Sequence, residues 1–267
     1  ISACLVGSEM CIRDRPGAVA MATLDRPDAG RRALLKQALG VAALLPAAWL
    51  ASRELPLEAW TADMHTAVGE RRQVPLSDGT FVQLNSDSAV DIDLGARRLT
   101  LLRGEVAVRL PGNLSLTLQV PYGQVALDAG EVCLRLVDQA CRVSVLKGTA
   151  NLQPRQGPAL LLQAGQQASL QVAGVGPVTG LDAWLLGWRE GVLRLEDRPL
   201  GELLHELRRY RPGVLRWAPE LEALRVTGTF RLDDTDRVLA LLAASLPLQV
   251  HTRTRYWVSL AARENRA

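Results

Sequence analysis

The sequence contains few of the residues that usually build catalytic or metal centres. It has only three histidines and four cysteines, and aromatic residues make up 4% of it. His65, His205 and His251 share no metal-ligand spacing with one another or with the cysteines. No glycine-rich phosphate loop follows a predicted strand, and no serine lies in a nucleophile elbow. We therefore expect a protein that is not an enzyme and that binds no metal or other cofactor.

The chain also lacks a large excess of charge of either sign. Its net charge is +3, and its first 36 residues hold six Lys or Arg against four acids. The remaining residues carry 25 basic side chains against 24 acidic ones. A nucleic-acid-binding domain normally concentrates positive charge on one face. We therefore expect no nucleic-acid partner.

Two of the cysteines fall in a segment that does not fit the rest of the chain. Residues 1–15, ISACLVGSEMCIRDR, resemble a translated sequencing adapter, so we expect them to be non-native and exclude them from the fold prediction. This leaves Cys133 and Cys141. The alternation of their strands places the two side chains on opposite faces. A disulfide, although natural in an exported protein, is therefore disfavoured unless a bulge intervenes.

A long apolar stretch follows residues 16–32. Residues 38–51 contain no charge, and the wider range 33–52 provides the roughly 20 residues that a bilayer requires. An uncleaved transmembrane helix is the simplest interpretation. A secretory signal peptide is the alternative, although no Ala-x-Ala cleavage signal follows the apolar stretch.

Basic residues precede this stretch and set its expected orientation. Under the positive-inside rule they keep the N-terminus in the cytoplasm and place the chain after residue 53 outside. Arg31 and Arg32 with the apolar residues after them also resemble a twin-arginine export signal. Paired arginines at this position can equally be simple topology determinants.

From Glu70 onward, short apolar and polar positions alternate around turn signals. Examples are Ser77-Asp78-Gly79 and Asn85-Ser86-Asp87. The spacing predicts about ten short antiparallel strands. We therefore expect a mainly β fold, with a linker at 53–65 and an antiparallel β-sandwich or β-roll domain at 66–180.

Residues 198–213, RPLGELLHELRRYRPG, predict an amphipathic helix. Pro199 suits the first helical position, and an apolar stripe follows it at helical spacing. The stripe consists of Leu200, Leu203, Leu204, Leu207 and Tyr210. The polar face carries Glu202, His205, Glu206, Arg208 and Arg209. This face is either ordinary solvated charge or a surface that a partner contacts.

The elements around this helix predict a small α+β domain at residues 181–267. A strand at 192–195 precedes the helix, and strands at 214–217 and 225–232 follow it. A second helix begins near Asp233 or Asp234 as N-cap, and strands at 248–251 and 256–260 close the chain. We expect a βαββαβ order with both helices on one face of a single small sheet.

Several of these segments resemble the FecR family of membrane-anchored sigma-factor regulators, over about residues 66 to 260. They are VPLSDGTFVQLNSDSAV, LLRGEVAV, VSVLKGTANL and LLQAGQ. The family signature W-x-x-G-x-L-x-F-x-x-x-P-L is matched by Trp188, Gly191, Leu193, Leu195, Pro199 and Leu200. Ala107 departs from the family pattern, because an aromatic residue usually stands there.

The resemblance implies a single-pass protein of the bacterial inner membrane with its C-terminal domains in the periplasm. Such a protein relays the state of a TonB-dependent outer-membrane receptor, here for iron-siderophore uptake, to an extracytoplasmic-function (ECF) sigma factor. The family usually has a longer helical sigma-binding domain before the span, so residues 16–32 are expected to be a truncated stub. The alternative is a membrane-anchored periplasmic β protein with a structural or glycan-binding role and no sigma factor.

The resemblance also indicates where a partner would bind. The C-terminal domain is similar to the signalling domains of secretins and TonB-dependent receptors, and the family is thought to meet such a receptor domain. One candidate surface is the polar face of the helix, with Glu202, Arg208, Arg209 and Tyr210. The other candidate is the open strand edge near Val226 and Leu248.

Three smaller features can each be interpreted in more than one way. Trp184 and Trp188 could form a ligand platform, although a hydrophobic hinge between the two domains is favoured. Glu105 follows Gly104 and is interpreted as a turn or strand-end residue rather than a catalytic carboxylate. Some members of the family are thought to cleave themselves at a Gly-Thr bond. The bonds Gly79-Thr80, Gly148-Thr149 and Gly228-Thr229 qualify, and each also fits a plain turn or strand.

Overall fold

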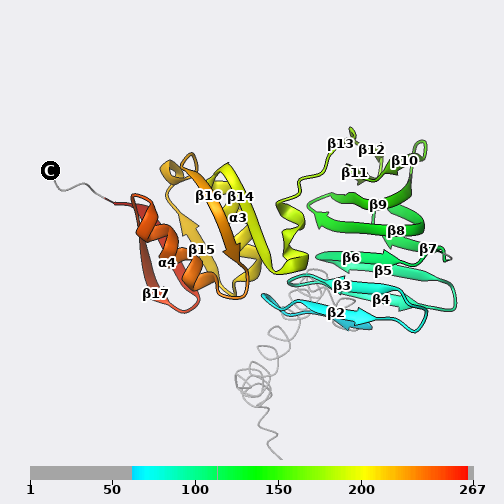
Figure 1. Ribbon diagram of the computed structural model, residues 1–267, viewed down its shortest axis with the longest axis horizontal. Helices are drawn as coiled ribbons and strands as arrows, with labels where there is room; N and C mark the ends of the chain where they lie inside the picture. The colour runs from blue at the N-terminus through cyan, green and yellow to red at the C-terminus, as the bar shows by residue number, and fades with distance from the viewer. Residues whose placement is uncertain (1–61, 113, 264–267) are drawn as a thin grey trace, which may run out of the picture. The chain divides into compact units, whose positions relative to one another are not determined.

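The computed structural model describes residues 62–112 and 114–263, which lie within one compact unit of the chain (Figure 1). The predicted membrane span at 33–52, the segment before it and most of the predicted linker lie outside the described residues. Within the described part of the chain, no helix is both long enough and apolar enough to cross a membrane. The fold of the described residues is mainly β, as the sequence predicts.

The residues up to 180, called here the β domain, form one continuous sheet of 13 strands. The strands are β1 (Met64–His65), β2 (Arg72–Pro75), β3 (Phe81–Leu84), β4 (Ala89–Asp93), β5 (Arg98–Arg103), β6 (Glu105–Leu110), β7 (Leu116–Val120), β8 (Gly123–Val137), β9 (Ala140–Pro154), β10 (Leu160–Gln163), β11 (Gln166–Gln171), β12 (Gly174–Val175) and β13 (Thr179–Gly180). Alternating burial along most of these strands places one face in the core, which agrees with the predicted pattern.

Two long antiparallel strands, β8 and β9, organise the sheet. The first half of β8 pairs with β7, and its second half pairs with β6 on the same edge. The path therefore divides into β7-β5-β4-β1 and β6-β3-β2, while β9 carries β10 and β11 on its other edge. The apolar faces of these strands share one core, which includes Leu84, Leu118 and Leu134.

Glycines allow the long hairpin to change direction where β8 passes from β7 to β6. Gly130 lies opposite Gly148, next to an irregularity in the register. Gly130 has a φ of 120°, and a Cβ there would stand 2.1 Å from the carbonyl oxygen of Lys147. Only a residue without a side chain fits this backbone conformation and this close approach.

The C-terminal module, residues 181–263, has its own strands and helices. They are the 3-10 helix η1 (Leu185–Glu190), β14 (Val192–Pro199), α3 (Leu200–Leu207), the 3-10 turn η2 (Arg208–Tyr210), β15 (Val214–Trp217), the 3-10 turn η3 (Pro219–Leu221), β16 (Arg225–Arg231), α4 (Thr235–Ser245), β17 (Leu248–Thr254) and β18 (Trp257–Ala262). Figure 1 shows these elements as a group that the segment before β14 joins to the β domain. The predicted helices and strands follow one another as expected, but β17 and β18 are separate strands, so the order is βαββαββ rather than βαββαβ.

Two details of this module differ from the prediction. The strands form two sheets, β14-β16 and β15-β18-β17, so the predicted single sheet is wrong. Both helices bury residues in a core that takes side chains from both sheets, and sequence periodicity cannot show this. Pro199 ends β14 and is the N-cap of α3 rather than its first residue, because the N–H of Leu200 still donates to the carbonyl of Leu224 across the strands (2.6 Å).

Candidate coupling site and partner-binding surfaces

Four charged side chains lie together where α3 and η2 meet the β domain. Glu105 and Glu206 are almost completely buried, with 3% of each side chain exposed. Arg135 and Arg209 are half-buried beside them. The group holds two carboxylates and two guanidinium groups, so it is neutral as a whole. We call these four residues the coupling network.

The contacts of the network join segments that are distant in the sequence. Nη1 of Arg209 donates to Glu105 Oε2 (2.8 Å) and to Glu206 Oε1 (2.6 Å). Arg135 forms an ion pair with Glu206 at 2.9 Å. The amide of Asn85 donates to Glu105 Oε2 and to the hydroxyl of Tyr210, both at 2.8 Å. Each buried carboxylate therefore has at least two polar partners, which offsets much of its desolvation.

A sharp turn positions Glu105 at the start of β6. Gly104 has a φ of 81°, and a Cβ there would come 2.3 Å from the hydroxyl oxygen of Ser88. The same hydroxyl accepts a hydrogen bond from the N–H of Glu105 (2.9 Å). The Gly-Glu pair therefore brings the carboxylate inward, where Arg209 reaches it.

The electrostatics of the network favour its charged form at Arg209. Burial alone disfavours the guanidinium, but Glu105 and Glu206 outweigh burial and raise the pKa of Arg209. Burial, then Glu206 and Glu105, raise the pKa of Tyr210, which keeps its hydroxyl protonated. Arg209 is therefore a permanent cation within the network, and Tyr210 is a neutral hydrogen-bonding group.

A buried tryptophan packs between the β domain and the C-terminal module. Trp188 is fully buried in a cluster that includes Ala107 and Cys133 of the β domain. This agrees with the predicted hinge. Trp184 is half-buried, with the guanidinium of Arg198 5.2 Å from its ring centre.

The two cysteines face opposite sides of the sheet, as their phase predicts. Cys141 lies in the core of the β domain, whereas Cys133 faces the C-terminal module. Both are buried, and neither forms a disulfide. Burial raises the pKa of the Cys141 thiol to about 12 and, with Glu105 beside it, also raises that of Cys133.

The polar face of α3 is not uniformly exposed. Glu202 and Arg208 reach solvent, and Glu202 pairs with Arg198 at 3.0 Å. The prediction that Glu206 and Arg209 belong to a solvent-exposed face is wrong, because both lie in the coupling network. Tyr210 is only 3% exposed, so its side chain faces the β domain rather than solvent.

The other predicted site residues are also placed by the structure, except the export signal. The side chains of Val226 and Leu248 are buried in the core of the C-terminal module. Among the described strands, β16 and β17 each have a neighbour on one side only, so the backbone edge rather than these side chains is available. Arg31 and Arg32 lie outside the described residues.

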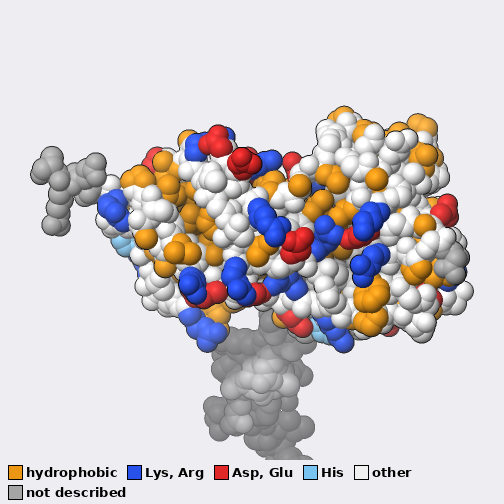
Figure 2. All heavy atoms as spheres, in the orientation of Figure 1, with side chains coloured by type: hydrophobic (Ala, Val, Ile, Leu, Met, Phe, Trp, Pro, Cys, Tyr) orange, Lys and Arg blue, Asp and Glu red, His pale blue; other side chains and the backbone are white. Residues whose placement is uncertain are grey.

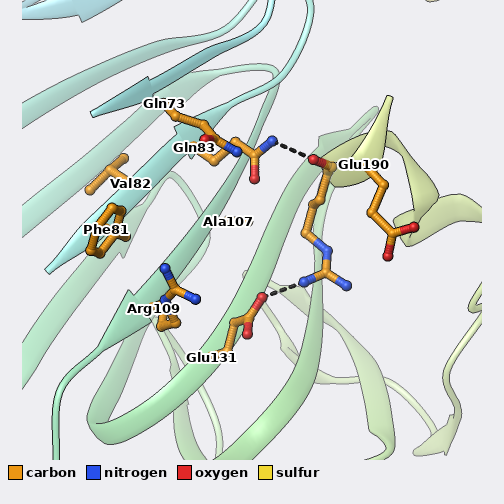
Figure 3. A pocket seen from close by; sticks show the side chains of 9 residues that line it. Gln73, Phe81, Val82, Gln83, Ala107, Arg109, Glu131 and Glu190 are labelled. Atoms are coloured by element: carbon orange, nitrogen blue, oxygen red, sulfur yellow. Dashed lines mark hydrogen bonds and ion pairs between the residues drawn. The ribbon is translucent and has the colours of Figure 1, made fainter. Parts of the chain in front are cut away.

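A recess of about 240 Å³ lies between the β domain and η1 (Figure 3). Its wall includes Phe81 with the guanidinium of Arg109 4.7 Å from the ring centre. Across the recess, Arg189 pairs with Glu131, and its backbone carbonyl accepts a hydrogen bond from Gln83 (2.9 Å). Figure 2 shows acidic and basic side chains lying next to one another on one face of the molecule.

Among the described residues, no group of three or more His, Cys, Asp or Glu could hold a metal ion. The three Gly-Thr bonds lie in different settings. Thr80 is fully buried, whereas Thr149 and Thr229 are exposed on β9 and β16. These placements leave self-cleavage as a prediction.

Comparison with known proteins identifies the class. Residues 62–151 match the family described as "FecR protein", as the sequence predicts. No curated protein matches the sequence. Two crystal structures of a candidate anti-sigma factor from Parabacteroides distasonis share the fold, each with a TM-score of 0.58. They are 18% and 17% identical, and each alignment covers 74% of this chain and 97% of the other.

Proposed function

We propose that this chain regulates a sigma factor. The FecR match at residues 62–151 supports this general role. The similarity of fold to a candidate anti-sigma factor extends the support to the C-terminal module, because the shared fold covers 74% of the chain.

The observation that carries the proposal is the coupling network. A regulator needs to pass a binding event at its sensing end to the rest of the molecule. Here η2 contributes Arg209 to a pair with Glu105 of the β domain, 104 residues away in the sequence. A buried network of ion pairs has few alternative arrangements and therefore holds two segments in one register. We propose that the C-terminal module receives the signal and that the network transmits it.

In its finer form, the proposal makes the chain a single-pass protein of the bacterial inner membrane with residues 33–52 as the span. The C-terminal module would contact the signalling domain of a TonB-dependent outer-membrane receptor in the periplasm. The cytoplasmic segment would act on an ECF sigma factor, with iron-siderophore uptake as the regulated process. Support comes from the charge asymmetry around 33–52 and from the similarity of the C-terminal elements to receptor signalling domains.

A promoter experiment tests the function. A reporter for the sigma-dependent promoter is placed in a strain lacking the gene, and the full chain is returned on a plasmid under iron limitation. Wild-type chain should restore the response to added ferric siderophore. Glu105→Gln, at equal abundance in the membrane, should mute it, whereas Glu190→Gln should leave it intact because that carboxylate is exposed and pairs with the exposed Arg194. Identical promoter activity with and without the wild-type gene would exclude a role in sigma regulation.

The topology has its own test. Alkaline phosphatase fused to the C-terminus should be active, because this enzyme needs the oxidising periplasm. A fluorescent protein that folds only in the cytoplasm should be dark at the same position. An inactive phosphatase with a bright cytoplasmic reporter would reverse the orientation while leaving the sigma-factor role open.

A further inference from the structure

The strand β17 has an open edge. It pairs with β18 and with no other described strand. The N–H of Arg263 donates to the carbonyl of Pro247, which fixes the phase of the antiparallel ladder. In this phase, Leu248, Val250 and Thr252 direct their backbone N–H and C=O groups away from β18. The side chain of Arg263 covers the carbonyl of Leu248 at 3.2 Å, so the backbone groups of Val250 and Thr252 lie at the open edge.

The segment that forms this edge and its turn, residues 237–263, carries basic but no acidic side chains, and the exposed Asp236 just before it is paired with Arg211. The sequence has no acidic residue between Asp236 and Glu264. Arg253 and Arg255 lie at the turn between β17 and β18, and both are exposed. Neither forms an ion pair with any described residue, unlike Arg211, Arg225 and many other arginines of the module. The charge of this turn is therefore available to a partner.

Two exposed aromatic residues accompany the arginines. Tyr256 is 50% exposed and Trp257 is 37% exposed. The guanidinium of Arg255 lies 4.9 Å from the ring centre of Tyr256, and that of Arg216 lies 5.0 Å from the ring centre of Trp257. Stacking holds a guanidinium flat on the ring while its N–H edge can still bind a carboxylate. We call Arg253, Arg255, Tyr256 and Trp257 the basic tip.

Residues 211–214 hold the backbone of the basic tip in place. Gly213 has a φ of 99°, and a Cβ there would come 2.2 Å from the carbonyl oxygen of Tyr256. This close approach lets the N–H of Val214 donate to the same oxygen at 2.7 Å. Arg211 donates to the carbonyl of Arg255 at 3.4 Å. A surface that is already ordered loses less entropy when a partner binds.

We propose that the open edge of β17 and the basic tip together form a docking site for an extended, acidic strand of a partner protein. The edge supplies main-chain pairing at Val250 and Thr252, and the tip selects negative charge. The ladder between β17 and β18 shifts register between Thr252 and Thr254, at the start of the tip, and resumes at Thr254 opposite Trp257. A second copy of this chain has no acidic residue between Asp236 and Glu264 to pair with the tip arginines, so it offers no complementary charge at this edge. The inference rests on the proposed function only for the source of the strand, a receptor signalling domain.

Binding of short labelled peptides to the full chain in detergent, measured by fluorescence anisotropy, tests the site. One peptide alternates Glu with Val and Thr, and its matched partner has Lys in place of Glu. The wild-type chain should bind the Glu peptide and not the Lys peptide. Arg253→Glu with Arg255→Glu should weaken the Glu peptide at least about tenfold and favour the Lys peptide. The double variant Arg98→Glu with Arg155→Glu makes the same charge change at exposed positions of the β domain and should leave binding unchanged.

A second variant tests the edge separately from the charge. Thr252→Pro removes an outward N–H and should weaken binding of the Glu peptide, whereas Thr252→Ala should not. Amide hydrogen exchange at residues 250–252 should slow when the Glu peptide is bound. Equal losses in the tip and β-domain double variants would overturn the inference. So would binding to anionic lipid vesicles that depends on the arginines but not on Thr252→Pro, because that result would indicate a membrane surface.

Different experimental results would contradict the proposed function and the proposed docking site. If a receptor signalling domain binds the wild-type chain but the tip and edge variants bind it equally well, the docking site is wrong and the function stands. If the Glu peptide behaves as expected and deletion of the gene leaves sigma-dependent transcription unchanged, the docking site stands and the function is wrong.

Discussion

At the scale of single residues, buried charges affect the stability of the fold more than exposed charges do. Moving an ion out of water costs several kcal/mol in a real protein, and a neighbouring opposite charge recovers this only with good geometry. In the coupling network Glu105 and Glu206 recover it through Arg209 and Arg135. Surface pairs such as Arg194 with Glu190 are well exposed and contribute little.

Removal of one buried charge should therefore cost far more than removal of an exposed one. Glu105→Gln leaves two guanidinium groups with a single buried carboxylate, and we expect it to lower the free energy of unfolding by about 3 kcal/mol. Glu202→Gln, whose partner Arg198 is half exposed, should change it by less than about 1 kcal/mol. Urea unfolding followed by tryptophan fluorescence measures both. Equal effects would show that the network does not stabilise the fold.

The buried thiols give a pH dependence with a defined direction. The pKa of Cys141 is about 12 in the folded protein, against 9.0 for an unperturbed thiol. The unfolded chain releases this proton first, so stability is full below pH 9 and falls as the pH rises from about 9 towards about 12. Cys141→Ser should reduce this alkaline loss in urea titrations at several pH values. Rapid reaction of Cys141 with a thiol reagent in the folded protein at pH 8 would contradict its burial.

At the scale of elements, the sequence predicts the burial of α3 well and its surroundings poorly. The leucine stripe is buried as predicted, because helical spacing alone determines which residues share a face. The same spacing cannot show that a second domain covers part of the polar face. Glu206 and Arg209 can be buried because residues of opposite charge pair with them. These are Arg135 and Glu105, which lie on strands much earlier in the sequence. The only sequence signal for this is Gly104-Glu105, which a turn explains equally well.

A charge placed in the stripe should unfold the C-terminal module. Leu203 is fully buried in the core of the module, so Leu203→Asp buries a carboxylate without a partner, which costs several kcal/mol. The matched change His205→Asp lies on the exposed side of the same helix and should be tolerated. Circular dichroism and limited proteolysis distinguish the outcomes. A folded Leu203→Asp module would show that α3 does not pack as described.

At the scale of the whole molecule, alternation and turn signals suffice to predict the β class, and local motifs suffice to predict the FecR match at residues 62–151. They do not predict how the two parts associate. Trp188 is an example, because its burial depends on Ala107 and Cys133 from strands β6 and β8. Ala107 stands where the family usually has an aromatic residue, and this small side chain faces the cluster that holds Trp188.

The shared cluster should make the β domain and the C-terminal module unfold together. Trp188→Ala removes its largest side chain and should cost about 3–5 kcal/mol. We expect the single thermal transition of the wild-type chain to separate into two in this variant, as measured by calorimetry. Trp184→Ala, at a half-buried position, should keep one transition. Two transitions already present in the wild-type chain would show that the modules unfold independently.

The long hairpin of β8 and β9 also bears on how the chain folds. Its strands are joined through a two-residue loop between Val137 and Ala140, so its contacts form between sequence neighbours with little loop-closure entropy. Strands β6, β7, β10 and β11 then add directly to its edges. We expect this hairpin to be the nucleus of folding, with amides of residues 132–136 and 141–145 protected first in pulse-labelled hydrogen exchange. The hairpin that joins the two branches of the finished sheet would then also be the template on which its other strands assemble.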